Sequence, residues 1–407
     1  MSARYSWAAA AVAVLVGGVA SAAPVVTGLN TGNLVISTGA LNTAGETVIY
    51  DRSPAAAGAS SSGKIVFDGS ESDTPGLKIV NDAAPGVPAS NGDVSNCVMA
   101  NSSASCNSEK QSGKRFKFQR TGHDATDLVF NVNKDGTFSS PTNDGLYKFF
   151  QAFGNDTGGR LGSFQVSLGT GVGTSFASST DTDGLSFKQT FGGKPPNNSQ
   201  LSALFANGLF GDIDDAHPIT GYFSQQRAGF GLEFLGQDSF QSTSLFGDYA
   251  SLFGPMLSYD QLPLGYFYDT DGNADTDDVL VAHQLANGKW VQNRDITATG
   301  DVQTYAYGNN GRLFDTEAEL VAYIKSLTGL AECGVAGTAC LAGSDSIDDL
   351  AKFNLSFFVD PTSFVGDQFT LRFESTSVPE PGSMALAVLA LGVAGASRRR
   401  KACAAHK

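Results

Sequence analysis

The sequence predicts a mostly β protein: an antiparallel β-sandwich-like body with one short helix, followed by a single C-terminal transmembrane helix. Short runs rich in Val, Ile and Phe recur along the 407 residues, and turns rich in Gly, Asp and Asn separate them. The 48 glycines and 28 phenylalanines, together with the near absence of long helical periodicity, are typical of a sandwich of short strands.

The first residues predict export. Arg4 provides a positive start, residues 8–19 are apolar, and Ala20-Ser21-Ala22 has the small side chains of a signal-peptide cleavage site. We expect signal peptidase to remove residues 1–22 and the remaining chain to leave the cytoplasm. The alternative is a buried N-terminal helix.

Two regions of different composition follow the signal peptide. Residues 23–110 are rich in Ser, Gly, Ala and Thr, and their only aromatic residues are Tyr50 and Phe67. They predict a loop-rich β layer or a small subdomain. Residues 111–375 hold most of the phenylalanines and are expected to form the sandwich body.

Local patterns place two elements within this body. Thr316 can cap a helix over 318–327, Glu319 can complete a capping box, and a glycine follows the last turn. Asn287-Gly288 separates two apolar runs and predicts a hairpin turn with positive φ at both central residues.

The cysteines predict two local disulfides. Cys97 and Cys106 form one close pair and Cys333 and Cys340 another, whereas Cys403 lies in the C-terminal tail. In an oxidising compartment each pair is expected to be bonded, which would stabilise the fold by roughly 2.5 kcal/mol per bridge. A four-cysteine zinc site is the alternative, but neither pair has the short gap of a zinc knuckle.

The processed protein is strongly acidic. Six of the 26 Lys and Arg residues, and none of the 40 Asp and Glu residues, lie in residues 1–22 and 382–407. This leaves 20 basic against 40 acidic residues, a net charge of about −20. Such a surface repels nucleic acid and anionic membranes, so we expect no nucleic-acid partner.

The clearest candidate site in the body is the acidic stretch DTDGNADTDD, residues 269–278. Oxygen-bearing side chains recur at every second residue, and calcium binds roughly six to eight oxygens. The stretch is not an EF-hand, because Ala274 stands where that loop requires glycine and Leu280 where it requires glutamate. Two interpretations stay open, a solvated acidic turn or a calcium site. The calcium ligands would be Asp269, Asp271, Asn273, Asp275 and Asp277.

Catalytic motifs are not recognisable in the sequence. It contains no HExxH metalloprotease motif, no GxSxG nucleophile elbow and no P-loop. His123, His217 and His283 are most simply structural residues. We therefore predict a protein that is not an enzyme and requires no cofactor. A secreted polysaccharide hydrolase is kept as the second alternative to the function given at the end of this section, because Asp and Glu are numerous and a glycosidase needs a pair of carboxylates.

The C-terminus contains three successive elements. Residues 376–382 form a linker whose two prolines do not fit a regular helix or a central strand. An apolar run follows and spans about 20 Å as a helix, and snorkelling cations extend its reach. We predict a transmembrane helix over 383–397 and a basic cytoplasmic tail over 398–407.

In this order, the elements resemble the PEP-CTERM sorting signal. The motif is Val378-Pro379-Glu380-Pro381, and the final cations are Arg398, Arg399, Arg400 and Lys401. The resemblance implies processing by exosortase, a membrane cysteine protease of Gram-negative bacteria that make exopolysaccharide. It also implies a transient inner-membrane anchor, removed near the prolines, and a final location at the cell surface or outside the cell.

Two segments of the body, 211–234 and 264–284, resemble the choice-of-anchor F family of secreted β-rich bacterial proteins. This resemblance implies a surface or matrix protein without an established activity. Together with the tail, it predicts a structural or adhesive protein associated with exopolysaccharide. The first alternative is a calcium-dependent carbohydrate-binding module that uses residues 269–278.

Overall fold

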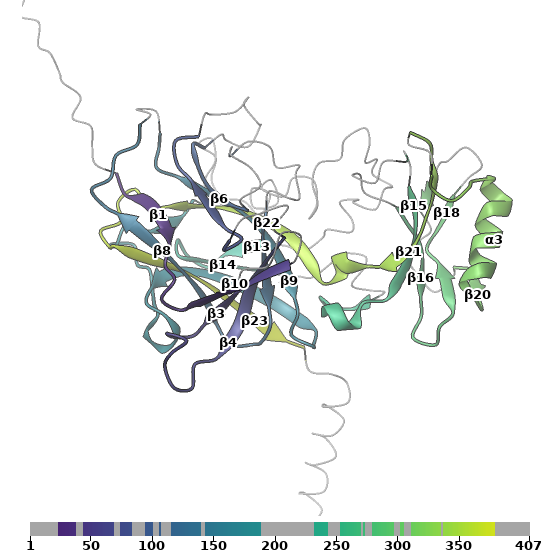
Figure 1. Cartoon of the computed structure of the whole chain (residues 1–407), viewed down its shortest axis with the longest axis horizontal. Helices are drawn as coiled ribbons and strands as arrows, with labels where there is room; N and C mark the ends of the chain where they lie inside the picture. The colour runs from purple at the N-terminus through teal and green to yellow at the C-terminus, as the bar shows by residue number, and fades with distance from the viewer. Residues whose placement is uncertain are drawn as a thin grey trace, which may run out of the picture.

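The computed structural model describes residues 23–37, 44–68, 74–83, 94–100, 106, 115–139, 143–188, 232–242, 253–269, 272, 279–296, 302–304, 311–334 and 337–378. These residues are mostly β, as predicted, and the α-helix among them is α3 (Glu317–Thr328) (Figure 1). None of their helices is long and apolar enough to cross a bilayer. The predicted signal peptide, transmembrane helix and basic tail lie outside them.

The first sheet, sheet A, contains the last strand of the chain near its centre. Its order is β1 (Val25–Leu29), β8 (Thr126–Asn133), β23 (Gln368–Ser377), β10 (Leu161–Thr170), β14 (Ser239–Ser242) and β13 (Leu232–Phe234), with β11 (Ala177–Ser178) beside β10. β23 pairs with β8 on one side and with β10 on the other. Sheet A is therefore complete only when residues 368–377 are in place.

The second sheet, sheet B, has nine strands. Seven of them form the path β12 (Ser186–Phe187), β22 (Lys352–Asp360), β9 (Tyr147–Asn155), β7 (Phe116–Arg120), β4 (Ser61–Asp68), β3 (Ala44–Tyr50) and β2 (Leu34–Ser37). β6 (Asn96–Met99) pairs with β9 and with β5 (Lys78–Val80). Strands from both composition regions thus share each sheet, because the aromatic-poor strands supply Val, Ile and Leu to the same core.

Two strand pairs depart from the predicted antiparallel arrangement. β6 and β7 both pair with β9 in parallel, one after the other along it. The reason is the path of the chain: it leaves β7 for β8 in sheet A and then returns to β9 in sheet B. Two successive reversals leave β7 and β9 pointing in the same direction.

Phenylalanine side chains join the two sheets into a sandwich. Buried residues of both sheets belong to one hydrophobic cluster. Ring centroids face one another across it at distances typical of tilted and edge-to-face aromatic pairs. The pairs are Phe118–Phe373 at 4.4 Å, Phe130–Phe149 at 5.5 Å and Phe164–Phe353 at 4.7 Å.

A third sheet forms a smaller lobe, residues 264–346, that is inserted between β14 and β22. Its order is β20 (Leu313–Phe314), β17 (Trp290–Gln292), β16 (Val279–Gln284), β15 (Leu264–Asp269) and β21 (Cys340–Ser346), and β18 (Arg294–Ile296) pairs with β19 (Val302–Thr304) nearby. Its core contains Tyr266, Trp290, Leu320 and Ile324, so α3 packs on this sheet. Figure 1 shows α3 on the side away from the sandwich.

The two chain crossings that connect this lobe to the sandwich lie side by side. The N–H of Ile347 donates to the carbonyl of Pro263 at 3.0 Å, and that of Leu257 donates to Leu350 at 2.9 Å. Two short 3-10 helices of the described part of the chain lie at these crossings, η3 (Tyr259–Gln261) and η4 (Asp348–Leu350). Another, η2 (Gly173–Ser175), lies in the turn between β10 and β11.

The predicted helix is confirmed and the predicted turn is partly wrong. Thr316 Oγ1 accepts a hydrogen bond from the N–H of Glu319 at 3.2 Å, and Gly329 ends α3 with a φ of 68°. In the hairpin after β16, Gly288 has a φ of 82° but Asn287 does not have a positive φ. The N–H of Gly288 donates to Leu285, which makes this a longer turn with one left-handed residue.

Candidate functional site

The first candidate site is the base of the C-terminal tail, where β23 ends. We call it the tail base and define it as Arg120, Arg160, Ser163 and residues 374–378. β23 pairs with β8 as far as Phe373 and with β10 as far as Ser377, which lies opposite Leu161. The hydrogen bonding extends one residue further, because the N–H of Val378 donates to the carbonyl of Arg160 at 2.9 Å. The first two residues of the predicted linker, 376 and 377, therefore belong to sheet A.

Arg120, the last residue of β7, is completely buried and joins the two sheets at this end of the sandwich. Its five N–H donors are all used. Nε donates to Ser375 Oγ, Nη1 to Thr126 Oγ1 and the carbonyl of Phe373, and Nη2 to two carbonyls of the turn between β7 and β8. Burial lowers the pKa of Arg120 to about 10, so the guanidinium is still protonated at neutral pH.

Two further contacts fix the last residues of β23. The hydroxyl groups of Ser163 and Thr376 lie 2.7 Å apart across β10 and β23 and share a hydrogen bond. Gly162 leaves room for the half-buried Val378, since a Cβ at Gly162 would lie 3.0 Å from Val378 Cγ2. The chain is thus held residue by residue up to the start of the predicted sorting motif.

The second candidate site is the acidic stretch. Tyr268 of β15 pairs with Val279 of β16, so the two ends of the acidic stretch lie side by side. Asp269 is buried at the end of β15, and its Oδ1 accepts a hydrogen bond from the N–H of Gly272 at 2.6 Å. The other predicted calcium ligands lie outside the described residues; they are Asp271, Asn273, Asp275 and Asp277.

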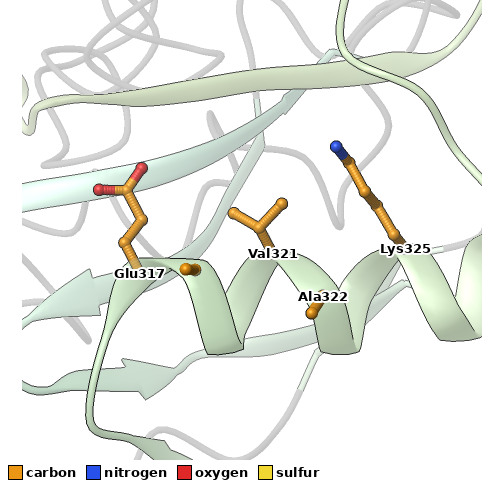
Figure 2. Close-up of a pocket in the computed structure, with 5 residues that line it drawn as sticks. Glu317, Val321, Ala322 and Lys325 are labelled. Carbon is orange, nitrogen blue, oxygen red and sulfur yellow. The ribbon is translucent and has the colours of Figure 1, made fainter.

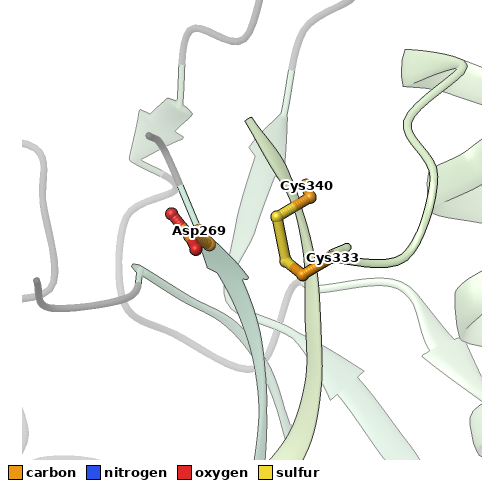
Figure 3. A group of neighbouring side chains, drawn as sticks. All are labelled: Asp269, Cys333 and Cys340. Atoms are coloured by element: carbon orange, nitrogen blue, oxygen red, sulfur yellow. A yellow bond between two sulfur atoms is a disulfide. The ribbon is translucent and has the colours of Figure 1, made fainter. Parts of the chain in front are cut away.

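Both predicted disulfides are formed, between Cys97 and Cys106 and between Cys333 and Cys340. The carboxylate of Asp269 lies beside the second one (Figure 3), with its oxygen and both sulfur atoms within 4.8 Å of one another. Because the two sulfur atoms are bonded to each other, neither can act as a thiolate ligand. This group, as it stands, offers a metal ion only the carboxylate.

An open cavity of about 540 Å³ lies along α3, lined by Glu317, Ala318, Val321, Ala322 and Lys325. Figure 2 shows Glu317 and Lys325 at opposite ends of this row, with Val321 between them. Lys325 Nζ pairs with a carboxylate oxygen of Glu332 at 2.9 Å. The lining residues therefore do not bring an acid and a base together at one point.

The described histidines lie in environments that suit structural residues. His283 is buried, its Nδ1 is 2.8 Å from the amide oxygen of Asn293, and its ring packs against Phe253. Burial lowers the pKa of His283. His123 is exposed in the turn between β7 and β8, and His217 lies outside the described residues.

Comparison with protein families gives one match. Residues 377–401 fit the family model of the PEP-CTERM protein-sorting motif. The chain carries a PEP-CTERM sorting motif. This match contains the predicted residues Val378, Pro379, Glu380 and Pro381 and the predicted cations Arg398, Arg399, Arg400 and Lys401. Of these, the structure describes Val378. No curated protein and no solved structure matches the chain.

The PEP-CTERM match starts where the sandwich ends. Its first residue, Ser377, is the last residue of β23, so no separate segment stands between the folded body and the sorting motif. The match does not reach 211–234 or 264–284, and the resemblance of these segments to the choice-of-anchor F family stays a prediction. Nothing in the sequence singles out Arg120, because its role depends on three strands meeting at one end of the sandwich.

Proposed function

We propose that this protein is a structural or adhesive component of the cell surface or extracellular matrix, associated with exopolysaccharide. The PEP-CTERM motif indicates an exported surface protein that is transiently held at a membrane and processed by exosortase. The observation that carries the further proposal is the direct continuation of the central strand β23 into this motif. The folded sandwich thus reaches directly to the sorting motif. Its net charge of about −20 after processing keeps the released protein soluble, as a component of a hydrated matrix must be.

The sorting step can be tested by separating the anchor from the motif. Replacing Pro379 and Pro381 by Ala should leave the protein inserted but uncut, because the apolar run still holds the chain while the presented motif is lost. The measurement is membrane fractionation with an antibody to the body and the intact mass of any released form. Pro54→Ala, in a turn before β4, is the control and should be released normally. Release of the double variant at normal size would contradict exosortase sorting.

The role after release can be tested on the fragment 23–378, which contains every described residue. We expect this fragment to bind exopolysaccharide preparations of its host and to leave them intact over time. A glycan array, read with calcium and with a chelator, compares this role with the alternatives. Loss of polysaccharide during incubation would instead favour the hydrolase, and absence of any binding would argue against a polysaccharide partner.

A calcium-dependent carbohydrate-binding module is the second candidate function. The observation that favours it is the pairing of Tyr268 with Val279, which brings together the two ends of a stretch that contains five aspartates. Carboxylates held this close repel one another unless water or a cation neutralises them, and calcium is a cation that oxygen ligands bind well. Glycan binding that disappears with the chelator would support this candidate.

A further inference from the structure

The tail base has a consequence for where the chain can be cut, and this inference rests on the proposed exosortase processing. A protease acts on an unpaired, extended segment of its substrate, so a segment paired within a sheet must first open. The opening of an end strand is easy only when few contacts hold it. The tail base is held by several.

These contacts extend to the last described residue. Residues 374–377 are paired with β10 alone, because β8 reaches only as far as Phe373. Ser375 accepts from the buried Arg120, Thr376 shares a hydrogen bond with Ser163, and Val378 donates to Arg160. A cut before Ser375 would remove one acceptor of the buried Arg120 guanidinium, which is unfavourable. A cut after Ser375 would instead remove the partner of Ser163, and a cut after Ser377 would remove the donor to Arg160.

The short distance to the predicted membrane helix points the same way. Five residues separate Val378 from Met384, the first residue of the apolar run. Fully extended, they span at most about 18 Å, at about 3.6 Å per residue. A protease embedded in the membrane therefore meets these five residues before it meets any paired part of the sandwich.

We infer that the tail base is the upstream limit of processing: exosortase cuts C-terminal to Val378, and the mature protein keeps the whole of β23. Hydrolysis there breaks one peptide C–N bond. Water supplies the OH of the new carboxyl group and the hydrogen of the new amine. No contact of the tail base is lost in this step, so the sandwich is equally complete before and after release.

The first test is the C-terminal residue of the protein that its host releases, read from the C-terminal peptide by mass spectrometry. We expect a terminus at Val378 or at one of the residues up to Ser383. A terminus at Ser377 or earlier would overturn the inference while leaving exosortase processing intact. A chain that still carries its basic tail would instead contradict the processing itself.

The second test locks the strand. Ser163 and Thr376 lie directly opposite each other with their hydroxyl groups 2.7 Å apart, which suits an engineered disulfide. The variant Ser163→Cys/Thr376→Cys should form this bridge during export and still be released at the rate of the single-cysteine controls, because β23 need not open. Peptide mapping without reduction confirms the bridge.

Two other results of the locking experiment are distinguishable: one contradicts the inference, and the other contradicts the proposed processing. If the bridged protein accumulates uncut while Ser163→Cys and Thr376→Cys are cut, processing requires β23 to open, and the inference is wrong. If neither the bridged protein, the single variants nor the unmodified chain is cut, the proposed processing itself is wrong.

Discussion

Arg372 of β23 and Asp127 of β8 form a two-point ion pair across the centre of sheet A. Nε lies 2.7 Å from Oδ1 and Nη2 lies 2.7 Å from Oδ2. The Asp127 side chain has no solvent exposure, and the guanidinium packs on the ring of Phe176 at 3.8 Å. Gly173 completes the arrangement, since its N–H donates to Asp127 and its carbonyl accepts from Arg372. The pair therefore holds the η2 turn against the sheet.

Removing one partner of this pair should be strongly destabilising. Arg372→Met leaves the Asp127 carboxylate buried without its counter-charge, for which we expect a loss of about 3–5 kcal/mol in the free energy of unfolding. The measurement is urea unfolding of the fragment 23–378. Lys134→Met is the control, because its partner Asp367 is 79% exposed and such pairs contribute about 0–1 kcal/mol. If both variants lost the same free energy of unfolding, burial of the Arg372–Asp127 pair would not determine its contribution to stability.

Substitution of Gln151 should stabilise the fold, in contrast to the loss expected for Arg372→Met. It is completely buried on β9, and neither atom of its amide group has a hydrogen-bond partner in the described part of the chain. An unsatisfied buried polar group costs about 1–3 kcal/mol, and Met has nearly the same shape. Gln151→Met should therefore raise the free energy of unfolding by part of this amount, read as a higher urea midpoint with an unchanged slope.

Asn155 provides the matched control for Gln151. It lies on the same strand and is equally buried, but its amide donates to the carbonyls of Gly159 and Met256 and accepts from Thr157. Asn155→Leu should lower the free energy of unfolding, because these partners are left unsatisfied. If Gln151→Met is destabilising as well, the Gln151 amide has a favourable partner, such as a buried water molecule.

Local features of the fold could be predicted from the sequence, because they depend on neighbouring residues. Short runs rich in Val, Ile and Phe predicted a β body, and β8 and β22 are two such runs. Thr316 with Glu319 predicted the start of α3. The disulfides followed from close spacing and export. The parallel pairing of β7 with β9 could not be predicted, since it depends on a strand of the other sheet standing between them in the chain.

The inserted lobe and the tail base were also hidden from sequence reasoning. Strands β15 and β16 are rich in apolar residues, as the strands of the sandwich are. Their sequences therefore do not indicate that they pack in a separate core. The sorting motif was recognisable because it is a contiguous pattern of residues. Arg120, in contrast, acquires its five hydrogen bonds only when β7, β8 and β23 are brought together by the fold.

His283 gives the inserted lobe a defined pH dependence. Burial lowers its folded-state pKa, although the hydrogen bond with Asn293 partly opposes the shift. The unfolded chain, with a histidine pKa of about 6.5, therefore takes up a proton first as the pH falls. The stability that neutral His283 contributes is complete above about pH 6.5 and is lost as the pH falls through the folded-state pKa.

His283→Gln should remove this contribution to the pH dependence. The free energy of unfolding is compared at about pH 7.5 and about pH 5.5, and the difference should be smaller in the variant than in the unmodified fragment. Carboxylate protonation affects both proteins alike and cancels in the comparison. A pH dependence of His283→Gln equal to that of the unmodified fragment would refute this role.

The two disulfides should differ in their resistance to reduction. Thiol–disulfide exchange requires a reductant to reach one of the sulfur atoms. Cys97 and Cys106 are both buried beside Phe150, whereas Cys333 is exposed. With increasing reductant, alkylation and mass spectrometry should detect free Cys333 and Cys340 before free Cys97 and Cys106. The reverse order would mean that the Cys97–Cys106 region opens more readily than its burial indicates.

The calcium interpretation of the acidic stretch is tested by stability. A ligand present at about 100 times its dissociation constant stabilises the folded state by about 2.7 kcal/mol, which is readily measured as a rise in Tm. If residues 269–278 bind calcium, millimolar calcium should raise the Tm of the fragment 23–378. Asp271→Ala with Asp275→Ala should abolish that rise, because two oxygen ligands of one ion are lost.

The control for this experiment must remove the same charge elsewhere. Asp135→Ala with Asp181→Ala removes the same number of aspartates from two turns outside the acidic stretch, where both side chains are exposed. This variant should keep the full calcium-induced rise in Tm, since screening of the net negative charge by calcium is altered equally in both double variants. An equal reduction in the two would mean that calcium acts on the overall charge and not at a site. No rise in the unmodified fragment would establish the stretch as a solvated acidic turn, because a bound cation would stabilise the folded state and free water does not.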